Sequence, residues 1–158
     1  MKEIKLTQGK VALVDDDDFE YLNQFKWCAH RKETTYYAVR SVTISPKKRI
    51  MVKMHRVIID AGIGIEVDHI DRNGLNNQKV NLRLCTGQQN RINRGAHRNN
   101  KSGFKGVSWN KKDKRWRACI SKDKKHFCVG SFSTPQEAAK AYDKAATKMF
   151  GEFAVLNY

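Results

Sequence analysis

Four polar residues between positions 68 and 90 have types and spacing that would suit hydrolysis of a phosphodiester: Asp68, His69, Asn81 and Asn90. Such a reaction needs a base to activate water and a cation to neutralise charge on the phosphate and on the leaving oxygen. Asp68 and Asn90 offer hard oxygen ligands, and a free imidazole such as that of His69 titrates near neutrality. The segment is therefore a candidate for metal-dependent chemistry.

The local pattern around these residues predicts a hairpin capped by a helix. Residues 67–71 are strand-like, a loop follows, and residues 81–84 form a second short strand. Thr86 with Gln89 three positions later makes a capping box, so Asn90 falls on the first turns of a helix. Taken singly, each polar residue also fits a turn, a helix cap or a buried histidine, and only their joint spacing favours a site.

The segment resembles the HNH family of homing and phage endonucleases, which have the ββα-metal fold. The resemblance covers about 36 residues and rests on Asp68-His69-Ile70-Asp71, Asn76-Asn77, Asn81-Leu82-Arg83 and Asn90, with His55-Arg56 upstream. The motif is then His, Asn, Asn, with Asn90 at the position of the family's last histidine.

This resemblance implies a role for each residue. Asp68 and Asn90 would hold one divalent metal ion, Mg²⁺ or Mn²⁺, whose other positions go to water and phosphate. His69 would face the opposite side as the general base, and Asn81 would hold the loop and the imidazole of His69 in place. His55 is interpreted as structural, because the apolar residues after it indicate a packed helix.

Residues 1–54 are predicted to form an α+β lead-in of short strands with one helix. Strands are expected at 10–14 and 36–44, and a helix from Asp17 to Trp27. The acidic run from Asp15 to Asp18 could suggest a metal site. Helix capping and the positive N-terminal dipole explain these residues better.

Net charge points to a polyanionic partner. The chain has 31 Lys and Arg against 16 Asp and Glu, a formal charge of +15, which is typical of nucleic-acid binders. We find no run of 18 apolar residues, no signal peptide and no lipidation motif that would favour a membrane. A soluble, cytoplasmic protein without a small-molecule substrate is expected.

The four cysteines are scattered and never form the CxxC pairs that bind zinc or carry redox chemistry. They are Cys28, Cys85, Cys119 and Cys128. We interpret them as free thiols and expect no structural zinc, although many HNH nucleases carry one on two such pairs.

Residues 93–103 are basic, Asn-rich and almost free of apolar side chains, which predicts a linker. The linker either lies along phosphates and orders on contact or is a solvated tether. From residue 93 to residue 158 there are 15 basic and 5 acidic residues. Most of the electrostatic attraction for a polyanion is therefore expected from this part of the chain.

The last segment predicts three strands, at 104–109, 115–121 and 127–132, and a helix from Pro135 to about Met149. Thr134 caps that helix and Glu137 completes its capping box. In the second strand Trp116, Ala118 and Ile120 alternate with Arg117, Cys119 and Ser121. One face of the sheet should therefore pack on the helix, and the other should meet solvent or a ligand.

This segment resembles the ethylene-response-factor (Apetala-type) DNA-binding domain over about 55 residues. The matching positions are Gly106-Val107, Trp116, Gly130-Ser131-Phe132, Glu137-Ala138-Ala139, Ala141-Tyr142-Asp143, Ala145-Ala146, Gly151 and Leu156-Asn157. That domain lays its three-stranded sheet in the major groove of double-stranded DNA. The resemblance implies DNA contacts for Lys105, Trp109, Lys111, Lys112, Lys114, Arg115, Arg117, Ser121, Lys122 and His126. Lys105, Trp109, Arg117, Cys119, Ser121, His126 and Cys128 would lie on the groove-facing side.

The module departs from the plant members of that family at Ser108, Ser121, His126 and Cys128, where bulkier or basic residues are usual. The plant target sequence is therefore not implied for this chain.

The predicted architecture is α+β, with a ββα-metal nuclease core joined to a three-stranded antiparallel sheet packed on one helix. Its parts are the lead-in at 1–54, the HNH core at 55–92, the linker at 93–103 and the DNA-binding domain at 104–158. The predicted function is a homing or phage-type DNA endonuclease that nicks its substrate, of bacterial or phage origin. Two alternatives stay open: a non-catalytic, sequence-specific transcriptional regulator, and RNA as the substrate.

Overall fold

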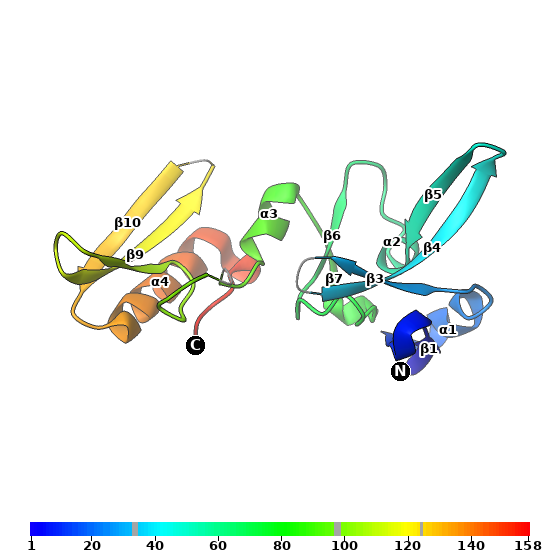
Figure 1. The fold of residues 1–158 in the computed structure, drawn as a ribbon, viewed down its shortest axis with the longest axis horizontal. Coiled ribbons are helices and arrows are strands. Elements are labelled where there is room, and N and C mark those ends of the chain that lie inside the picture. Colours follow the sequence, from blue (N-terminus) through cyan, green and yellow to red (C-terminus); the bar gives the residue numbers. More distant parts are fainter. Residues whose placement is uncertain (33–34, 97–98, 124) are drawn as a thin grey trace. The chain divides into compact units, whose positions relative to one another are not determined.

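Two compact units, Met1–Asn90 and Arg91–Tyr158, make up the computed structural model, which describes residues 1–32, 35–96, 99–123 and 125–158. Figure 1 labels their helices and strands. Each unit has its own cluster of buried apolar residues, and each contains antiparallel sheet. The chain is a mixed α and β protein with several small antiparallel sheets.

Within its described residues, the first unit forms a two-stranded sheet of β1 and β2, a three-stranded sheet in the order β3-β4-β5, and a two-stranded sheet of β6 and β7. The strands are β1 (Lys2–Lys5), β2 (Val11–Val14), β3 (Cys28–Lys32), β4 (Thr35–Ser45), β5 (Lys48–Lys53), β6 (Glu66–His69) and β7 (Leu82–Cys85). The helices are α1 (Asp16–Leu22) and α2 (Met54–Ile58), while α3 (Gly87–Ile92) follows β7. Short 3₁₀ turns lie at η1 (Thr7–Gly9) and η2 (Lys79–Asn81).

The core of the first unit joins the lead-in to the HNH segment. Ile4, Val14, Leu22, Trp27 and Met54 are each no more than 2 % exposed and belong to one cluster. Met54 begins α2, whose later residues pack against the same cluster. The predicted boundary between residues 54 and 55 therefore falls inside one packed core.

Backbone hydrogen bonds tie the lead-in to the loop between β6 and β7. The amide of Leu13 donates to the carbonyl of Leu75, and the amide of Asn77 donates to the carbonyl of Leu13, both at 2.8 Å. The carboxylate of Asp15 accepts from the backbone amide of Lys79 at 2.7 Å. The capping role expected for Asp15 is wrong, because its side chain makes no cap hydrogen bond to α1 and binds the loop instead.

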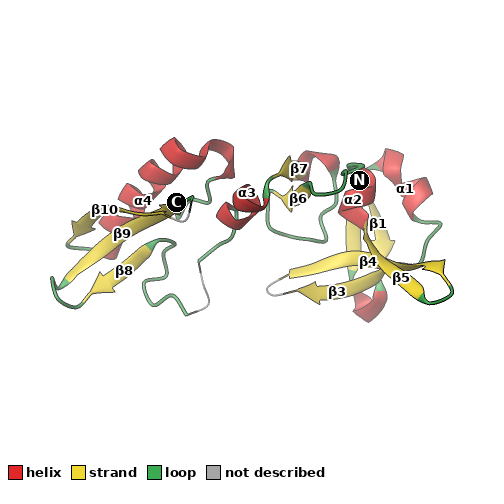
Figure 2. Ribbon diagram, turned by 90° about the horizontal axis from the view of Figure 1, so that it is seen from above, coloured by secondary structure: helices red, strands yellow, loops and turns green. Residues whose placement is uncertain are grey.

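The second unit is a three-stranded sheet in the order β10-β9-β8, with α4 on one face (Figure 2). Its elements are β8 (Val107–Asn110), β9 (Arg115–Lys122), β10 (Lys125–Phe132), α4 (Pro135–Phe150) and η3 (Gly151–Phe153). Ala138, Ala139 and Tyr142 of α4 are buried with Ala118 and Ile120 of β9. The small alanine side chains allow the helix to lie close to the sheet.

The predicted capping box of α4 is confirmed. Thr134 accepts from the backbone amide of Glu137, the carboxylate of Glu137 accepts from the amide of Thr134, and Pro135 takes the first helical position.

Among the described residues, no helix is both long and apolar enough to cross a membrane.

The end of the predicted linker is built into the second unit. The side-chain oxygen of Asn100 accepts from the amide and the hydroxyl of Ser102, at 2.8 and 2.7 Å. The Ser102 hydroxyl also bonds the carbonyl of Val107 at 2.8 Å. These bonds fold residues 100–102 against the start of β8. His97 and Arg98, which the predicted linker includes, lie outside the described residues.

Candidate functional site

Strand β6 carries two of the predicted site residues, Asp68 and His69, on opposite faces. Successive side chains of a strand alternate between its two sides, and the antiparallel register sets Asp68 opposite Arg83 and His69 opposite Leu82. Both residues are about 5 % exposed. Asp68 faces α3, whereas His69 faces the side of the lead-in that carries Tyr37 and His55.

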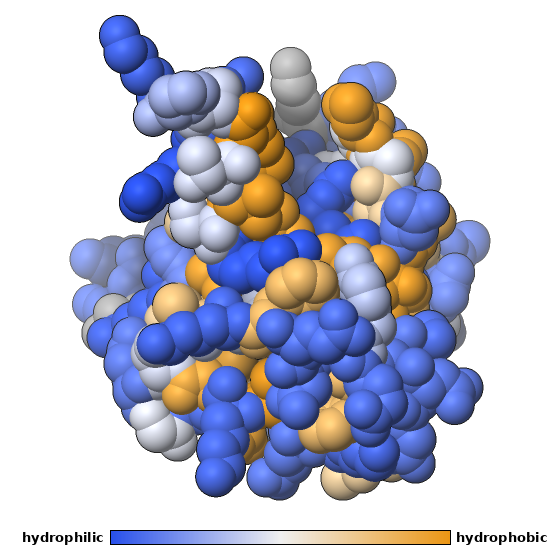
Figure 3. Space-filling model, turned by 90° about the vertical axis from the view of Figure 1, so that its right-hand side faces the viewer, coloured by the Kyte–Doolittle hydropathy of each residue, from blue (hydrophilic) through white to orange (hydrophobic). Residues whose placement is uncertain are grey.

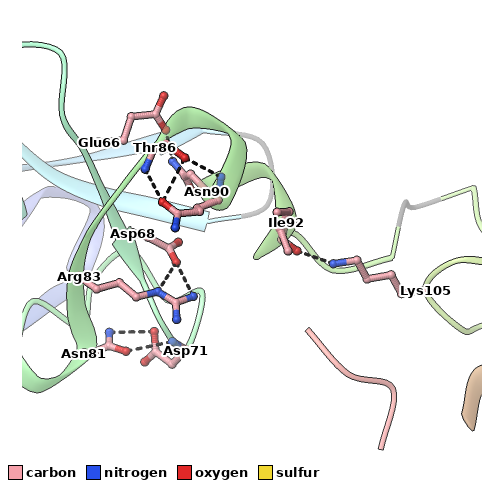
Figure 4. A network of polar contacts seen from close by, with 10 residues as sticks. Glu66, Asp68, Asp71, Asn81, Arg83, Thr86, Asn90, Ile92 and Lys105 are labelled. Atoms are coloured by element: carbon pink, nitrogen blue, oxygen red, sulfur yellow. Dashed lines mark hydrogen bonds and ion pairs between the residues drawn. The ribbon is translucent and has the colours of Figure 1, made fainter. Parts of the chain in front are cut away.

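The Asp68 face collects charged and amide groups (Figure 4). The guanidinium of Arg83 donates from Nε and Nη2 to Oδ2 of Asp68, at 3.0 and 2.8 Å. Glu66 lies two residues before Asp68, on the same side of the strand, and accepts from the side-chain nitrogen of Asn90 at 2.5 Å. Strand β6 and the start of α3 therefore bring the two predicted metal ligands, Asp68 and Asn90, to the same side of the hairpin.

The helix start that presents Asn90 is formed as predicted. The amide of Thr86 donates to the side-chain oxygen of Gln89 at 2.8 Å, and the amide of Gln89 donates back to the Thr86 hydroxyl at 3.2 Å. This reciprocal pair satisfies amides that the first turn of α3 leaves without helical partners.

The donor set on this face fits a hard divalent cation. Carboxylate and amide oxygens are the ligands that Mg²⁺ and Mn²⁺ prefer, and the ion pair with Arg83 shows that Asp68 accepts a positive neighbour. Across the described parts of the chain, no group of three or more His, Cys, Asp and Glu side chains could hold a metal. A cation held by Asp68 and Asn90, with water and phosphate oxygens in its other positions, stays a prediction.

On the other face, His69 lies in a cluster of rings. Its ring centroid is 4.9 Å from that of His55 and 5.7 Å from that of Tyr37, both edge to face. Its Nε2 lies 3.4 Å from the side-chain oxygen of Asn77. A general base must reach the attacking water, so the small exposed part of His69 is where the reaction would have to occur.

Asn81 holds the loop rather than the ring. Its side-chain oxygen accepts from the amide of Asp71 at 3.0 Å, and its side-chain nitrogen donates to the carboxylate of Asp71 and to the carbonyl of Asn76, at 2.9 and 2.8 Å. The amide that lies within reach of the imidazole of His69 is Asn77. The two tasks predicted for Asn81 are therefore divided between two asparagines.

Both histidines are held in a poorly solvated environment. Burial lowers the pKa of His55 to about 3, and the charge that His69 has when protonated and the charges of Lys53 and Arg56 add to the effect. Burial also lowers the pKa of His69, against the opposing influence of the Asn77 hydrogen bond and of two nearby carboxylates. Nδ1 of His55 is buried and has no hydrogen-bond partner among the residues that the structure describes. The folded state thus keeps His55 neutral across the physiological range.

The lowered pKa of His55 predicts that the first unit loses stability in mild acid. The His55 side chain binds a proton near pH 6.5 in the unfolded chain but only near pH 3 in the folded protein. The contribution of His55 therefore lowers the free energy of unfolding as the pH falls from 6.5 towards 3, and it does not change above pH 6.5. Each pKa unit is worth about 1.4 kcal/mol, which gives at most about 3 kcal/mol between pH 6.5 and about 4.5. Hydrogen exchange of β4 amides measures it. His55→Gln should show a shallower pH dependence, and an unchanged slope would contradict the assignment.

The outer face of the second unit carries four of the predicted DNA-binding residues. Ala118 and Ile120 are buried beneath α4, so by alternation the residues between them on β9 face away from the helix. His126 of β10 is opposite Ser121 and their side chains are hydrogen-bonded at 2.8 Å. The outward residues are Arg115, Arg117, Ser121 and His126, with Cys119 opposite Cys128 between them. Lys111, Lys112 and Lys114 are exposed in the turn from β8 to β9.

Three other predicted DNA contacts lie elsewhere. The register sets Trp109 opposite Trp116, on the side of the sheet that packs on α4, rather than in the outward row predicted for it. Lys122 reaches the carbonyl of Met149 at 3.5 Å. The ammonium group of Lys105 donates to the carbonyl of Ile92 at 2.5 Å (Figure 4), so this side chain is engaged within the unit.

Comparison with known proteins bears on both units. Residues 102–152 match the family model of the AP2 domain. The chain is 32 % identical over 155 residues to an uncharacterized HNH endonuclease of Acanthamoeba polyphaga mimivirus. This match covers 95 % of this chain and 76 % of that protein. The chain belongs to the HNH endonuclease family. It is also 34 % identical over 91 residues to Protein 3.8 of Escherichia phage T7, covering 58 % of this chain and 74 % of that protein. No solved structure matches significantly.

For this HNH endonuclease family member, the sequence identified the combination of an HNH segment with an AP2-type module. Sequence reasoning missed the neighbours of the motif: Glu66 beside Asn90, Arg83 on Asp68, and Tyr37 and His55 against His69. Glu66 could have been found from its position two residues before Asp68 on the same strand. Tyr37 carries no such signal, because it reaches His69 only through the tertiary fold.

Proposed function

We propose that this chain is a metal-dependent DNA endonuclease that nicks double-stranded DNA, with Asp68 and Asn90 as the ligands of one Mg²⁺ or Mn²⁺ ion. The observation that carries this proposal is that strand β6 presents its polar side chains on two opposite sides. Its two adjacent residues present a carboxylate to the side of Asn90 and an imidazole to the opposite side. When bound, the cation neutralises charge on the phosphate and on the leaving oxygen.

The protein's own groups account for the remaining requirements. His69 accepts the proton of the attacking water, and its lowered pKa keeps the ring neutral and able to do so. Asn77 fixes the ring through Nε2, and Asn81 closes the loop between β6 and β7. These two asparagines fix the position of the His69 ring on the hairpin. The hydrogen bonds that Leu13 and Asp15 make to the loop between β6 and β7 support it.

DNA binding by the AP2-type module supports the same function. The outward row of β9 and β10 and the lysine-bearing turn lie in the module that matches the AP2 domain, and they carry exposed Lys and Arg side chains. Phosphate contacts by lysines supply affinity that does not depend on sequence, while Arg117 and its outward neighbours are placed to reach base edges. Such a module would keep the small hydrolytic site near its substrate.

Incubation of the full chain with supercoiled plasmid tests the proposal. With Mg²⁺ we expect conversion to the open-circular form, because one active site cuts one strand, and with EDTA we expect none. The products should carry 3′-hydroxyl and 5′-phosphate ends. Labelled duplex DNA and duplex RNA compared side by side decide between the two substrates. A parent protein that cuts neither polymer in any divalent metal rules out the enzyme.

A second candidate function, a non-catalytic DNA-binding regulator, is favoured by one observation. Asp68 is already paired with Arg83, and His69 is buried, with 5 % of the residue exposed, as would suit an HNH fold kept as a scaffold. Binding of duplex DNA without metal-dependent cutting would select this function over the first.

A further inference from the structure

The hairpin of β4 and β5 leaves its sheet. Strand β3 pairs with β4 only from Thr35 to Val39, whereas β4 and β5 stay paired from Val39 opposite Lys53 out to Ser45 opposite Lys48. Beyond Val39 the two strands therefore continue as a two-stranded ribbon, which extends past β3 in Figure 1. We call residues 40–52 the ribbon.

The ribbon is basic. From residue 35 to residue 53 there are five Lys and Arg residues and no Asp or Glu. Lys47, Lys48 and Arg49 are all exposed at its tip. Arg40 belongs to its base, where the guanidinium lies 3.8 Å from the ring centroid of Phe25. The acidic residues of the lead-in lie mainly on and before α1, so the ribbon has a uniform positive charge of its own.

The ribbon also exposes apolar side chains. Ile44 is 50 % exposed, Ile50 is 41 % exposed and Met51 is 57 % exposed. Figure 3 shows hydrophobic side chains running up the projecting ribbon beside hydrophilic ones. A two-stranded hairpin is only marginally stable in water by itself. Ile50 and Val42 are opposite each other on one face of the ribbon, whereas Met51 is on the other face. Apolar side chains exposed among polar ones mark an interaction surface when they form a patch.

We propose that the ribbon is a second contact with duplex DNA, lying in the major groove with Lys47, Lys48 and Arg49 against phosphates. The major groove admits a two-stranded antiparallel ribbon. Charge complementarity favours a polyanion, and Ile50, on the face that it shares with Val42 opposite it, supplies the apolar surface that contacts thymine methyl groups. The inference rests on the proposed DNA binding and adds a site in the first unit, separate from the AP2-type sheet.

The rival occupant is a second copy of this chain, joined through the exposed strand edges or the exposed apolar side chains. Two ribbons that carry only positive charges would then be brought together, which disfavours that pairing. Dimer formation is therefore measured as one outcome of the test.

The test is the salt dependence of duplex binding by the full chain in EDTA, followed by fluorescence anisotropy of a labelled duplex. The variant Lys47→Gln/Lys48→Gln/Arg49→Gln is compared with Lys2→Gln/Lys5→Gln/Lys26→Gln, which removes the same charge from exposed residues of the same unit. Each lost phosphate contact lowers the slope of log affinity against log salt by about 0.9. We expect the ribbon variant to lose up to about 2.7 in slope, and the control to keep the parent slope.

Hydroxyl-radical footprints give an independent readout, because the parent should protect a stretch of backbone that the ribbon variant no longer protects. Equal slopes and equal footprints for ribbon and control variants overturn the inference and leave DNA binding by the AP2-type module intact. A parent that binds no duplex at low salt overturns both. A dimer in sedimentation that Ile50→Ser/Met51→Ser converts to a monomer, with no change in slope, assigns the ribbon to a second copy instead.

Discussion

Replacing His69 with alanine is expected to slow metal-dependent nicking by about 10²- to 10⁴-fold, the usual contribution of a general base. The imidazole belongs to a buried ring cluster with His55 and Tyr37, so removing it also leaves a cavity. His69→Gln separates the two effects, because it retains much of the volume and a hydrogen-bonding group for Asn77 but accepts no proton near neutral pH. Initial rates of open-circle formation measure the loss.

His30→Ala is the matched control, since His30 is an exposed histidine on β3 of the same unit. It should cut at the parent rate. Binding of duplex in EDTA should be the same for all three variants, because none of the substituted residues belongs to the ribbon or to the outward face of the AP2-type sheet. If His69→Gln cuts as fast as the parent while it remains folded, another group supplies the base.

The second large effect is expected from Gly106→Ala, which should destabilise the second unit by roughly 3 to 5 kcal/mol through left-handed strain and overpacking combined. Gly106 has a φ of +73°, and an added Cβ would lie 2.2 Å from the ring of Tyr142 and 2.8 Å from the carbonyl of Cys119. Tyr142 is itself 4 % exposed, so its ring has little room to move. Denaturant unfolding, followed by tryptophan fluorescence, measures the change.

Gly103→Ala isolates the backbone contribution. Gly103 has nearly the same φ, +76°, but an added Cβ would meet nothing within 4 Å. We expect it to cost only about 1 kcal/mol. Equal losses of unfolding free energy for the two variants would contradict the prediction. They would mean that the Tyr142 ring moves aside at little cost, and that α4 is not held as close to the sheet of β8, β9 and β10 as the structure places it.

The parts of this molecule that the sequence predicts well are those governed by neighbouring residues. Thr134, Pro135 and Glu137 define a helix start by local hydrogen bonds, and Thr86 with Gln89 does the same. Strand alternation in β9 placed Arg117 and Ser121 outward because a regular strand has a fixed period. The resemblance to the HNH family likewise rests on a short stretch of chain, which holds Asp68, His69, Asn81 and Asn90.

The failures share one cause, which is dependence on contacts between distant segments. The register between β8 and β9 sets Trp109 opposite Trp116, and a strand's own pattern does not reveal that pairing. Asn77 rather than Asn81 reaches the imidazole because Leu13 holds the loop from the far side of the unit. Asp15 was assigned to its adjacent helix, yet it binds residue 79.

The ion pair between Asp68 and Arg83 has a practical consequence. The buried carboxylate has a counter-ion supplied by its own hairpin, so removal of the cation proposed to bind there would leave no bare negative charge in the interior. Chelator-treated protein should therefore keep its melting temperature. Under the proposed mechanism, such a metal-free preparation would stay folded and inactive until the cation is added.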